Sequence, residues 1–217
     1  MVRKTSQKPK RELRTPQQAR SRRTREKILA AAVACFEELG YDATTTAAIA
    51  KRARIAVGSL YGYFQDKRAI LLELWEKTSS EISSYIISSL DPEEWRDAEP
   101  RASVRTLIDA LFHARTFNPG MQRIIWERYF KDAEFREAVQ TTEIRVRTAM
   151  VELFAVLKAQ GKLRVADVGS AAFVVHTSVE WTASRIMLGT AGAEVDQAVE
   201  ATSDMVSRFL FHDGKRA

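Results

Sequence analysis

The sequence predicts an all-α protein with about nine helices, and three observations support this fold class. Apolar residues recur at the helical spacing of three to four positions in the segments after residue 23. No alternating run of Val, Ile or Thr bounded by turn residues competes for a β-strand. Stop and start signals separate the segments, namely Asp91-Pro92-Glu93-Glu94, Asn118-Pro119-Gly120, Gly161 and Asp167. With 217 residues, 45% of them hydrophobic, the chain can bury a full core.

Residues 1–23 are predicted to form a basic arm without fixed structure. They contain nine Lys or Arg and one acid, Glu12, whereas the whole chain has a net charge of only +6. The arm holds almost no apolar side chains, so burial cannot offset the entropy lost on ordering. A polyanionic partner would therefore meet this arm first. A solvating tail or a cloning remnant is the alternative explanation.

The first helix is expected at about residues 24–39. Its apolar positions follow one helical face, and Gly40 supplies a C-terminal stop; they are Ile28, Leu29, Ala32, Val33, Phe36 and Leu39. The single cysteine, Cys35, lies in this apolar run, where a buried inert thiol is expected and redox sensing is the alternative. The chain shows neither the apolar region of a signal peptide nor a membrane-length apolar run, which predicts a cytoplasmic protein.

Residues 44–64 read as a short helix, a tight turn and a second short helix. In a helix-turn-helix a small residue lies within the first helix, here Ala50, because the two helices cross steeply. Apolar plugs fill the angle between the helices, and Ile49, Ile55 and Leu60 suit that role. The second helix would present Gly58 and Ser59 to base edges, and Tyr61 and Tyr63 to phosphate oxygens. A generic helical hairpin whose aromatic residues simply pack is the alternative.

This stretch resembles the TetR family of bacterial one-component regulators over about residues 24–72. The resemblance rests on Thr44-Thr45-Thr46, Ile49-Ala50, Gly58-Ser59-Leu60-Tyr61 and the run from Tyr63 to Ile70. It implies a three-helix DNA-binding domain, a connecting fourth helix that begins near Asp66, and a divergent C-terminal domain for dimerisation and ligand binding. It also implies that Thr45 caps the second helix near phosphate, that Tyr61 and Tyr63 touch the DNA backbone, and that Lys67 grips phosphate.

Two residues of the turn depart from the family pattern. Arg54 stands where the family usually has glycine, and Ala56 stands where it usually has a Ser or Thr cap. An arginine at positive φ costs about 1 kcal/mol, and an alanine cap forfeits roughly as much again. An added phosphate contact from Arg54 could offset the cost. The predicted DNA-binding residues are Arg20, Arg22, Arg23, Arg25, Thr45, Arg54, Gly58, Ser59, Tyr61, Tyr63 and Lys67.

Two C-terminal segments, 168–190 and 194–212, each carry an apolar stripe at helical spacing. Such helices suit a four-helix bundle made with a second copy, which the family resemblance also implies. Packing within one chain is the alternative. The predicted dimerisation residues are Val175, Val179, Ile186, Val199, Met205, Val206 and Phe209.

The middle of the chain is rich in aromatic residues, which makes an apolar cavity between helices plausible. The expected ligand is an apolar compound, aromatic or polycyclic, that releases the protein from DNA. Each ring could instead belong to the core. The predicted ligand-binding residues are Phe112, Phe117, Met121, Trp126 and Phe130.

The predicted organisation is therefore a basic arm at 1–23, a helix-turn-helix domain at 24–70 and a helical ligand and dimerisation domain at 71–217. The expected partners are a palindromic double-stranded operator, a second copy and a small apolar ligand, with repression as the expected output and no membrane partner. No catalytic motif surrounds His113, His176 or His212, so we expect no enzymatic activity, no metal and no cofactor. The alternatives are a DNA binder without a ligand and a non-specific nucleic-acid-binding protein.

Overall fold

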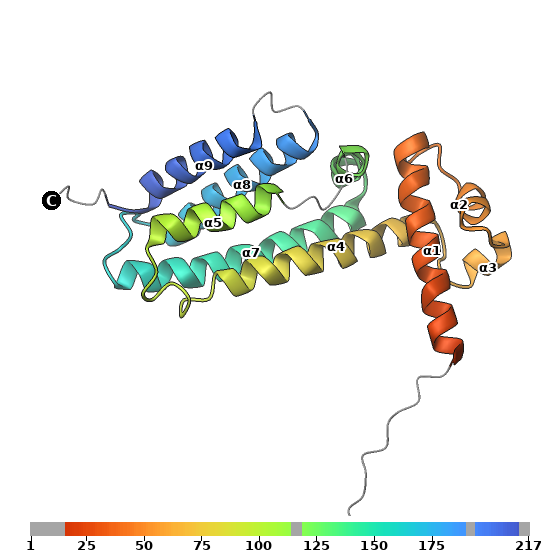
Figure 1. Ribbon diagram of the computed structural model, residues 1–217, viewed down its shortest axis with the longest axis horizontal. Coiled ribbons are helices and arrows are strands. Elements are labelled where there is room, and N and C mark those ends of the chain that lie inside the picture. Colours follow the sequence, from red (N-terminus) through yellow and green to blue (C-terminus); the bar gives the residue numbers. More distant parts are fainter. Residues whose placement is uncertain (1–15, 114–118, 190–193, 213–217) are drawn as a thin grey trace, which may run out of the picture.

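The computed structural model describes residues 16–113, 119–189 and 194–212, and it confirms the all-α prediction (Figure 1). These residues form nine helices and one isolated antiparallel bridge between Leu163 and Phe211. The helices are α1 Pro16–Leu39, α2 Thr46–Ala53, α3 Val57–Tyr61, α4 Lys67–Ser89, α5 Pro100–His113, α6 Pro119–Lys131, α7 Ala133–Ala159, α8 Val168–Met187 and α9 Val195–Leu210. None of the helices within the described ranges is long and apolar enough to cross a bilayer.

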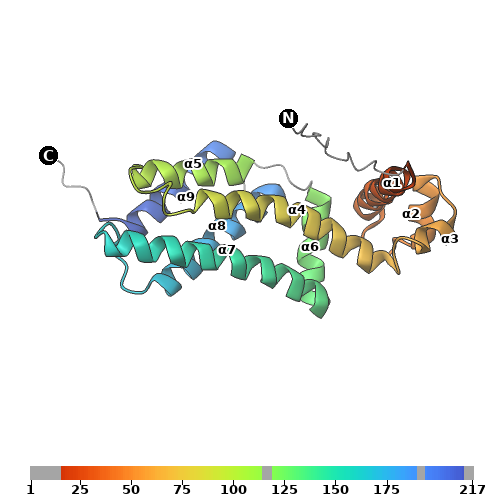
Figure 2. The same ribbon diagram turned by 90° about the horizontal axis from the view of Figure 1, so that it is seen from below.

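Helices α1, α2 and α3 form a compact unit at one end of the molecule, and α4 runs from this unit into the rest of the chain (Figure 1). Helices α4 and α7 lie side by side along the long axis, as both views show (Figure 2). Helices α5, α8 and α9 cover that pair, while α6 lies across the junction and contacts α1. A movement of α6 or α4 can therefore reach the N-terminal unit.

The first helix begins earlier than the sequence predicted. Helix α1 starts at Pro16, so residues 16–23 of the predicted unstructured arm are helical, and residues 1–15 lie outside the described residues. Proline is favoured in the first turn because its missing N–H needs no partner there. The following segment is rich in Gln, Ala and Arg, which are good helix formers. The helix was missed because it carries no apolar stripe in this first stretch.

Carboxylate caps begin the three long helices that build the C-terminal part. Asp66, Asp132 and Asp167 each precede a helix and accept a hydrogen bond from a backbone N–H of its first turn. Such a cap stabilises a helix by about 1 kcal/mol. Helix α4 continues unbroken through residue 70, so the predicted domain boundary falls inside a helix.

Two apolar clusters make up the core. The first lies beneath α1 to α4 and includes residues of α6 and α7, such as Ile124 and Phe135. The second joins α5, α7, α8 and α9 around Leu153, Leu157 and Leu210. Because α6 and the start of α7 complete the core of the N-terminal unit, the two parts of the chain are mechanically connected.

Candidate nucleic-acid interface and ligand cavity

The angle between α2 and α3 is filled as the sequence predicted. Ile49, Ala50 and Leu60 are 0% exposed, and Ile55 packs partly buried against the same cluster. The small side chain of Ala50 permits the close crossing of the two helices. These residues fix the orientation of α3 and leave its opposite face in solvent.

The turn between the helices contains the strained residue that the family comparison predicted. Arg54 has φ 57° and ψ 46°, and it is the one non-glycine residue with positive φ in the described ranges. Its N–H bonds back to the carbonyl of Lys51, and Ile55 N–H bonds to that of Ala50. Ala56 precedes α3 without a side-chain cap. The side chain of Arg54 is exposed beside α3, so it is available for a phosphate.

The outer face of α3 is exposed and carries Val57, Gly58, Ser59 and Tyr61. A Cβ built on Gly58 would meet no atom within 4 Å, and the backbone of Gly58 is not at positive φ. A glycine within a helix costs about 1 kcal/mol relative to alanine. Neither packing nor backbone geometry within this chain accounts for the glycine. A partner surface that approaches the backbone of α3 closely would account for it.

The hydroxyl groups around α2 have distinct surroundings. Thr45 is the N-cap of α2, and its Oγ1 accepts a hydrogen bond from Ala48 N–H at 3.1 Å. Thr44 is buried and donates to backbone carbonyls near the end of α1. The Thr46 hydroxyl lies 3.0 Å from the hydroxyl of Tyr61, which is 54% exposed. Tyr63 is only half-buried and packs against the first core cluster. Of the two tyrosines, Tyr61 is therefore the more accessible to DNA.

Lys67, for which a phosphate contact was predicted, is bound within the protein. Its Nζ donates to the carbonyls of Tyr41, Asp42 and Thr44 at 2.7, 3.0 and 2.8 Å. An ammonium group has three donors, so these bonds use its full capacity. The ammonium also lies 4.6 Å from the ring centroid of Tyr41. Lys67 fixes the α1–α2 turn, and the sequence did not predict this because its partners lie more than 20 positions away.

Arg25 is likewise held inside the unit. Its Nε donates to Glu73 Oε1 at 2.6 Å, its Nη2 bonds Glu73 Oε2, and its guanidinium lies 4.6 Å from the Phe64 ring centroid. Arg25 therefore ties α1 to α4. Arg20, Arg22 and Arg23 are exposed one to two turns earlier on α1. Of the four predicted arm contacts, these three can reach a phosphate without breaking an ion pair with Glu73.

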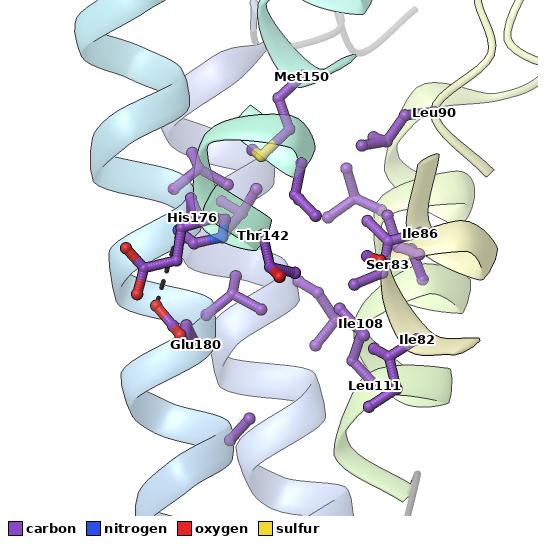
Figure 3. Close-up of a pocket in the computed structure, with 18 of the residues that line it drawn as sticks. Ile82, Ser83, Ile86, Leu90, Ile108, Leu111, Thr142, Met150, His176 and Glu180 are labelled. Carbon is purple, nitrogen blue, oxygen red and sulfur yellow. Dashed lines mark ion pairs between the residues drawn. The ribbon is translucent and has the colours of Figure 1, made fainter. Parts of the chain in front are cut away.

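A cavity of about 240 Å³ lies in the C-terminal part between α4, α5, α7 and α8. Its wall is mostly apolar, with Ile82 and Ile86 of α4 opposite α8 and with Ile108 and Leu111 of α5 beside them (Figure 3). Thr142 of α7 lies between the two walls. The cavity is large enough for a small organic molecule and offers it a hydrophobic environment.

The titratable residues that line the cavity are Glu143, His176 and Glu180. Burial raises the pKa of Glu180 to about 7, and the negative charge of Glu143 adds to the shift. Burial also raises the pKa of Glu143, although Arg147 opposes this. The pKa of His176 is lowered by burial and by Arg147, so its imidazole is neutral at pH 7. His176 Nδ1 lies 3.7 Å from Glu180 Oε2 (Figure 3).

Four of the residues predicted to bind a ligand, Phe112, Met121, Trp126 and Phe130, do not line this cavity. Phe112 and Met121 are buried in the second and first core clusters, Trp126 packs edge-on against Trp181, and Phe130 is 69% exposed. Phe117 lies outside the described residues. The apolar residues Met121, Ile124 and Ile125 of α6 complete the core beneath α1, and α6 contributes only Gln122 to the described lining of the cavity.

The predicted dimerisation residues divide between the core and the surface. Val175, Val199 and Val206 are buried in the second cluster, and Val179 and Ile186 pack partly buried against it. Met205 and Phe209 are 49% and 41% exposed. Helix α8 has a second apolar stripe that the sequence analysis did not separate from the first. The exposed apolar residues of α8 and α9 are Phe173, Val174, Trp181, Met205 and Phe209.

The polar groups of the cavity were not predicted from the sequence. His176 was noted only as a histidine without a catalytic motif around it, and Glu143 and Glu180 were not singled out. A signal did exist, because Glu180 follows His176 by four positions on the inner side of α8. Cys35 is buried, as expected. Over the described ranges, no group of three or more His, Cys, Asp and Glu side chains is arranged to hold a metal.

Tyr41 connects the cavity part of the chain to the helix-turn-helix. Its ring is flanked by Lys67 of α4 and by the guanidinium of Arg128 of α6, each 4.6 Å from the centroid. Arg128 also lies 3.4 Å from Asp42 in the α1–α2 turn. Nearby, Arg68 of α4 pairs with Asp132 before α7 at 2.6 Å. A displacement of α6 would therefore act directly on the segment that positions α2.

Comparison with known proteins agrees with this architecture. Residues 28–74 match the family model described as bacterial regulatory proteins, tetR family. The chain is 29% identical over 124 residues to the HTH-type transcriptional regulator AcrR of Shigella flexneri, covering 56% of this chain and 54% of that protein. It is 30% identical over 123 residues to the HTH-type transcriptional repressor KstR of Mycobacterium tuberculosis, with the same coverage. The chain thus spans about half the length of the curated relatives it matches.

Solved structures share the fold over most of the chain. SmeT of Stenotrophomonas maltophilia, solved as a triclosan complex, has a TM-score of 0.70 at 22% identity and covers 88% of this chain and 93% of its own. FadR of Bacillus halodurans has a TM-score of 0.68 at 17% identity and covers 90% and 97%. The family match falls on the helix-turn-helix described above, so residues 28–74 belong to the TetR family of bacterial regulatory proteins.

Proposed function

We propose that this protein is a sequence-specific DNA-binding transcriptional repressor that a small ligand releases from a palindromic operator. The observation that carries the proposal is the exposed face of α3. No contact within the described parts of the chain requires a glycine at position 58, while the buried side of the same helix is tightly packed. A short helix that presents its backbone this closely suits the major groove.

The contacts on DNA divide by chemistry. Gly58 and Ser59 face base edges, because the glycine allows close approach and the hydroxyl can donate or accept. Tyr61, Arg54 and the exposed arginines Arg20, Arg22 and Arg23 surround α3 or extend from α1 and reach phosphates. Phosphate contacts raise affinity for every sequence, whereas the contacts of Ser59 select among sequences. A protein that binds a chromosomal operator in a bacterium acts in the cytoplasm.

A second copy of the chain covers the exposed apolar residues of α8 and α9 in this proposal. Phe173, Trp181, Met205 and Phe209 are each more than two-fifths exposed, which is costly for a contiguous apolar surface in water. A two-fold axis through this face would bury equivalent residues of both copies. It would also relate two α3 helices, so the operator would be an inverted repeat with half-sites about 34 Å apart or a multiple of that distance.

The ligand occupies the cavity between α4, α5, α7 and α8 in this proposal. Two solved structures with this fold support a small-molecule ligand, since SmeT was solved as a triclosan complex and Bacillus subtilis FadR in complex with stearoyl-CoA. The cavity is bounded by α4, whose first residues include Lys67 and Arg68. A ligand that prefers a different tilt of α4 would shift the two DNA-binding units relative to each other.

Selection from random duplexes tests the proposal. The full-length protein should enrich an inverted repeat and bind it at least about a thousandfold more tightly than random DNA at physiological salt. Ser59→Ala should change the enriched bases, and Tyr61→Ala should weaken binding to all sequences alike. Uniform affinity with no enriched motif would instead favour a non-specific nucleic-acid-binding protein. Specific binding that no cavity ligand alters would favour a regulator without a ligand.

A further inference from the structure

The cavity wall has an uncompensated acidic side. Glu143 of α7 and Glu180 of α8 both line it, and their mutual repulsion is one of the causes of the raised pKa of Glu180. Among the described residues, the one ion-pair neighbour of the Glu180 carboxylate is His176, whose imidazole is neutral at pH 7. A buried carboxylate without a cationic partner is costly, because desolvation is not offset.

Arg147 is the basic residue that acts electrostatically on this part of the cavity wall, but its guanidinium lies near another side chain. Arg147 affects Glu143 and His176 electrostatically but forms no ion pair with either glutamate. Its guanidinium carbon lies 5.9 Å from the ring centroid of Phe173, an exposed residue on the outer side of α8. From α4, α5, α6 and α9 the cavity receives apolar and uncharged polar side chains, including Ser83 and Gln122. Among the lining residues within the described ranges, none is a lysine or an arginine.

The remaining wall is mostly apolar. Ile82, Ile86 and Leu90 follow one face of α4, and Ile108, Leu111 and Leu107 follow α5 (Figure 3). Glu180 lies on the opposite side, on α8 (Figure 3), and Glu143 of α7 also lines the cavity. A molecule that fills this space therefore meets hydrocarbon along most of its surface and the carboxyl groups of these two residues. Hydrophobic burial supplies affinity there, and the carboxyl groups select the charge of the ligand.

We infer that the cavity takes an amphipathic organic cation, an amine or quaternary ammonium attached to an apolar body, with Glu180 as its principal counter-ion and Glu143 in support. This inference rests on the proposed function, because it names the class of ligand for the same cavity. The bound cation provides the positively charged partner that the Glu180 carboxylate lacks among the described residues. Binding keeps Glu180 ionised, so the protein releases a proton when the cation enters below about pH 7.

Three probes of equal chain length test the charge preference: decyltrimethylammonium, 1-decanol and decanoate. Binding to the full-length protein is followed by tryptophan emission, since Trp75 and Trp95 line the cavity. The ammonium should bind at least tenfold more tightly than the alcohol at pH 8, and decanoate should bind most weakly. Between pH 8 and pH 6 the affinity for the ammonium should fall about tenfold, as expected for a carboxyl group of pKa about 7, while that for decanol stays constant.

Two variants locate the effect. Glu180→Gln should bring the ammonium and the alcohol within threefold of each other and remove the pH dependence, while leaving decanol binding unchanged. Glu152→Gln changes an exposed glutamate of α7 outside the cavity and should keep the preference for the cation. Retention of the preference in Glu180→Gln would overturn the assignment of the counter-ion.

The outcomes also separate this inference from the function on which it rests. If decanol binds and releases operator DNA as well as the ammonium does, or if decanoate binds most tightly, the cation inference fails and ligand sensing stands. If none of the three probes binds, both fail. Preferential binding of the ammonium together with the loss of that preference in Glu180→Gln supports both.

Discussion

Polar side chains of the helix-turn-helix have bonding partners within the chain, whereas a carboxylate of the cavity lacks a cationic partner among the described residues. In the N-terminal unit, Lys67, Arg25 and Thr44 are satisfied by partners within the chain, and they hold α1, α2 and α4 together. In the cavity, Glu180 is partly buried near a second carboxylate and a neutral imidazole. A polar residue whose hydrogen bonds are all made within the chain stabilises the fold. A polar residue whose desolvation is not offset by a partner is a candidate for ligand recognition.

Gly58 belongs with Glu180 in this comparison, although it lies on the surface. Its helix would be more stable with alanine, and nothing in the chain opposes the added methyl group. Lys67 shows the reverse case. A family pattern assigns it to DNA, but its donors are already occupied. Substitutions of the two kinds of residue, those with partners within the chain and those without, should therefore have different effects.

The largest effect is expected from Lys67→Met, which removes three charge-assisted hydrogen bonds from the α1–α2 turn. We expect the free energy of unfolding to fall by about 2–3 kcal/mol, as measured by denaturant titration. Below the melting transition, the salt dependence of operator affinity should keep its slope, because no phosphate contact is lost. A slope reduced by about one per protomer, with unchanged stability, would restore the phosphate role.

Glu180→Gln should produce a smaller effect that depends on pH. The folded pKa of Glu180, about 7, lies above its ordinary value, so its contribution to stability is present in acid and is lost as the pH rises through 7. The variant should match the wild type at pH 4, below the ordinary pKa of a glutamate, and exceed it by roughly 1–2 kcal/mol at pH 8, a value reduced because a third of the side chain is exposed. Equal stability of the two proteins at both pH values would contradict an uncompensated carboxylate.

Arg54→Gly should have the smallest effect on stability, a gain of about 1 kcal/mol, because glycine tolerates the φ of 57°. The same change should weaken operator binding and reduce its salt slope by about one per protomer, while the preferred sequence stays the same. Thermal unfolding and salt titrations measure the two effects separately. A gain in stability without loss of affinity would show that Arg54 is a departure without a function on DNA.

The sequence was sufficient for the features that depend on neighbouring residues. The plugs Ile49 and Leu60, the cap at Thr45 and the strained turn at Arg54 all lie within one short motif, so spacing and turn chemistry predicted them. The fold class followed in the same way from helical periodicity.

Features that depend on distant residues were not predictable. Glu73 lies 48 positions from Arg25, and the carbonyls that bind Lys67 lie more than 20 positions before it. Periodicity showed that α8 and α9 are amphipathic but not which stripe faces inward, so Val175 and Val206 were assigned to a dimer contact that Met205 and Phe209 are better placed to make. Likewise, the aromatic residues of α6 indicated an apolar environment without showing that Tyr129 packs against the first core cluster while Phe130 is exposed.

We expect Gly58 to add nothing to the stability of the fold and to be required for DNA binding. Gly58→Ala tests this expectation against a matched control, Gly169→Ala, because both glycines are the second residue of a helix and both are exposed. Alanine at either position should leave the melting temperature unchanged or raise it. We expect Gly58→Ala to weaken binding to the selected operator at least about tenfold, and Gly169→Ala to change it less than about twofold. Operator binding by Gly58→Ala as tight as that of the wild type would contradict the account.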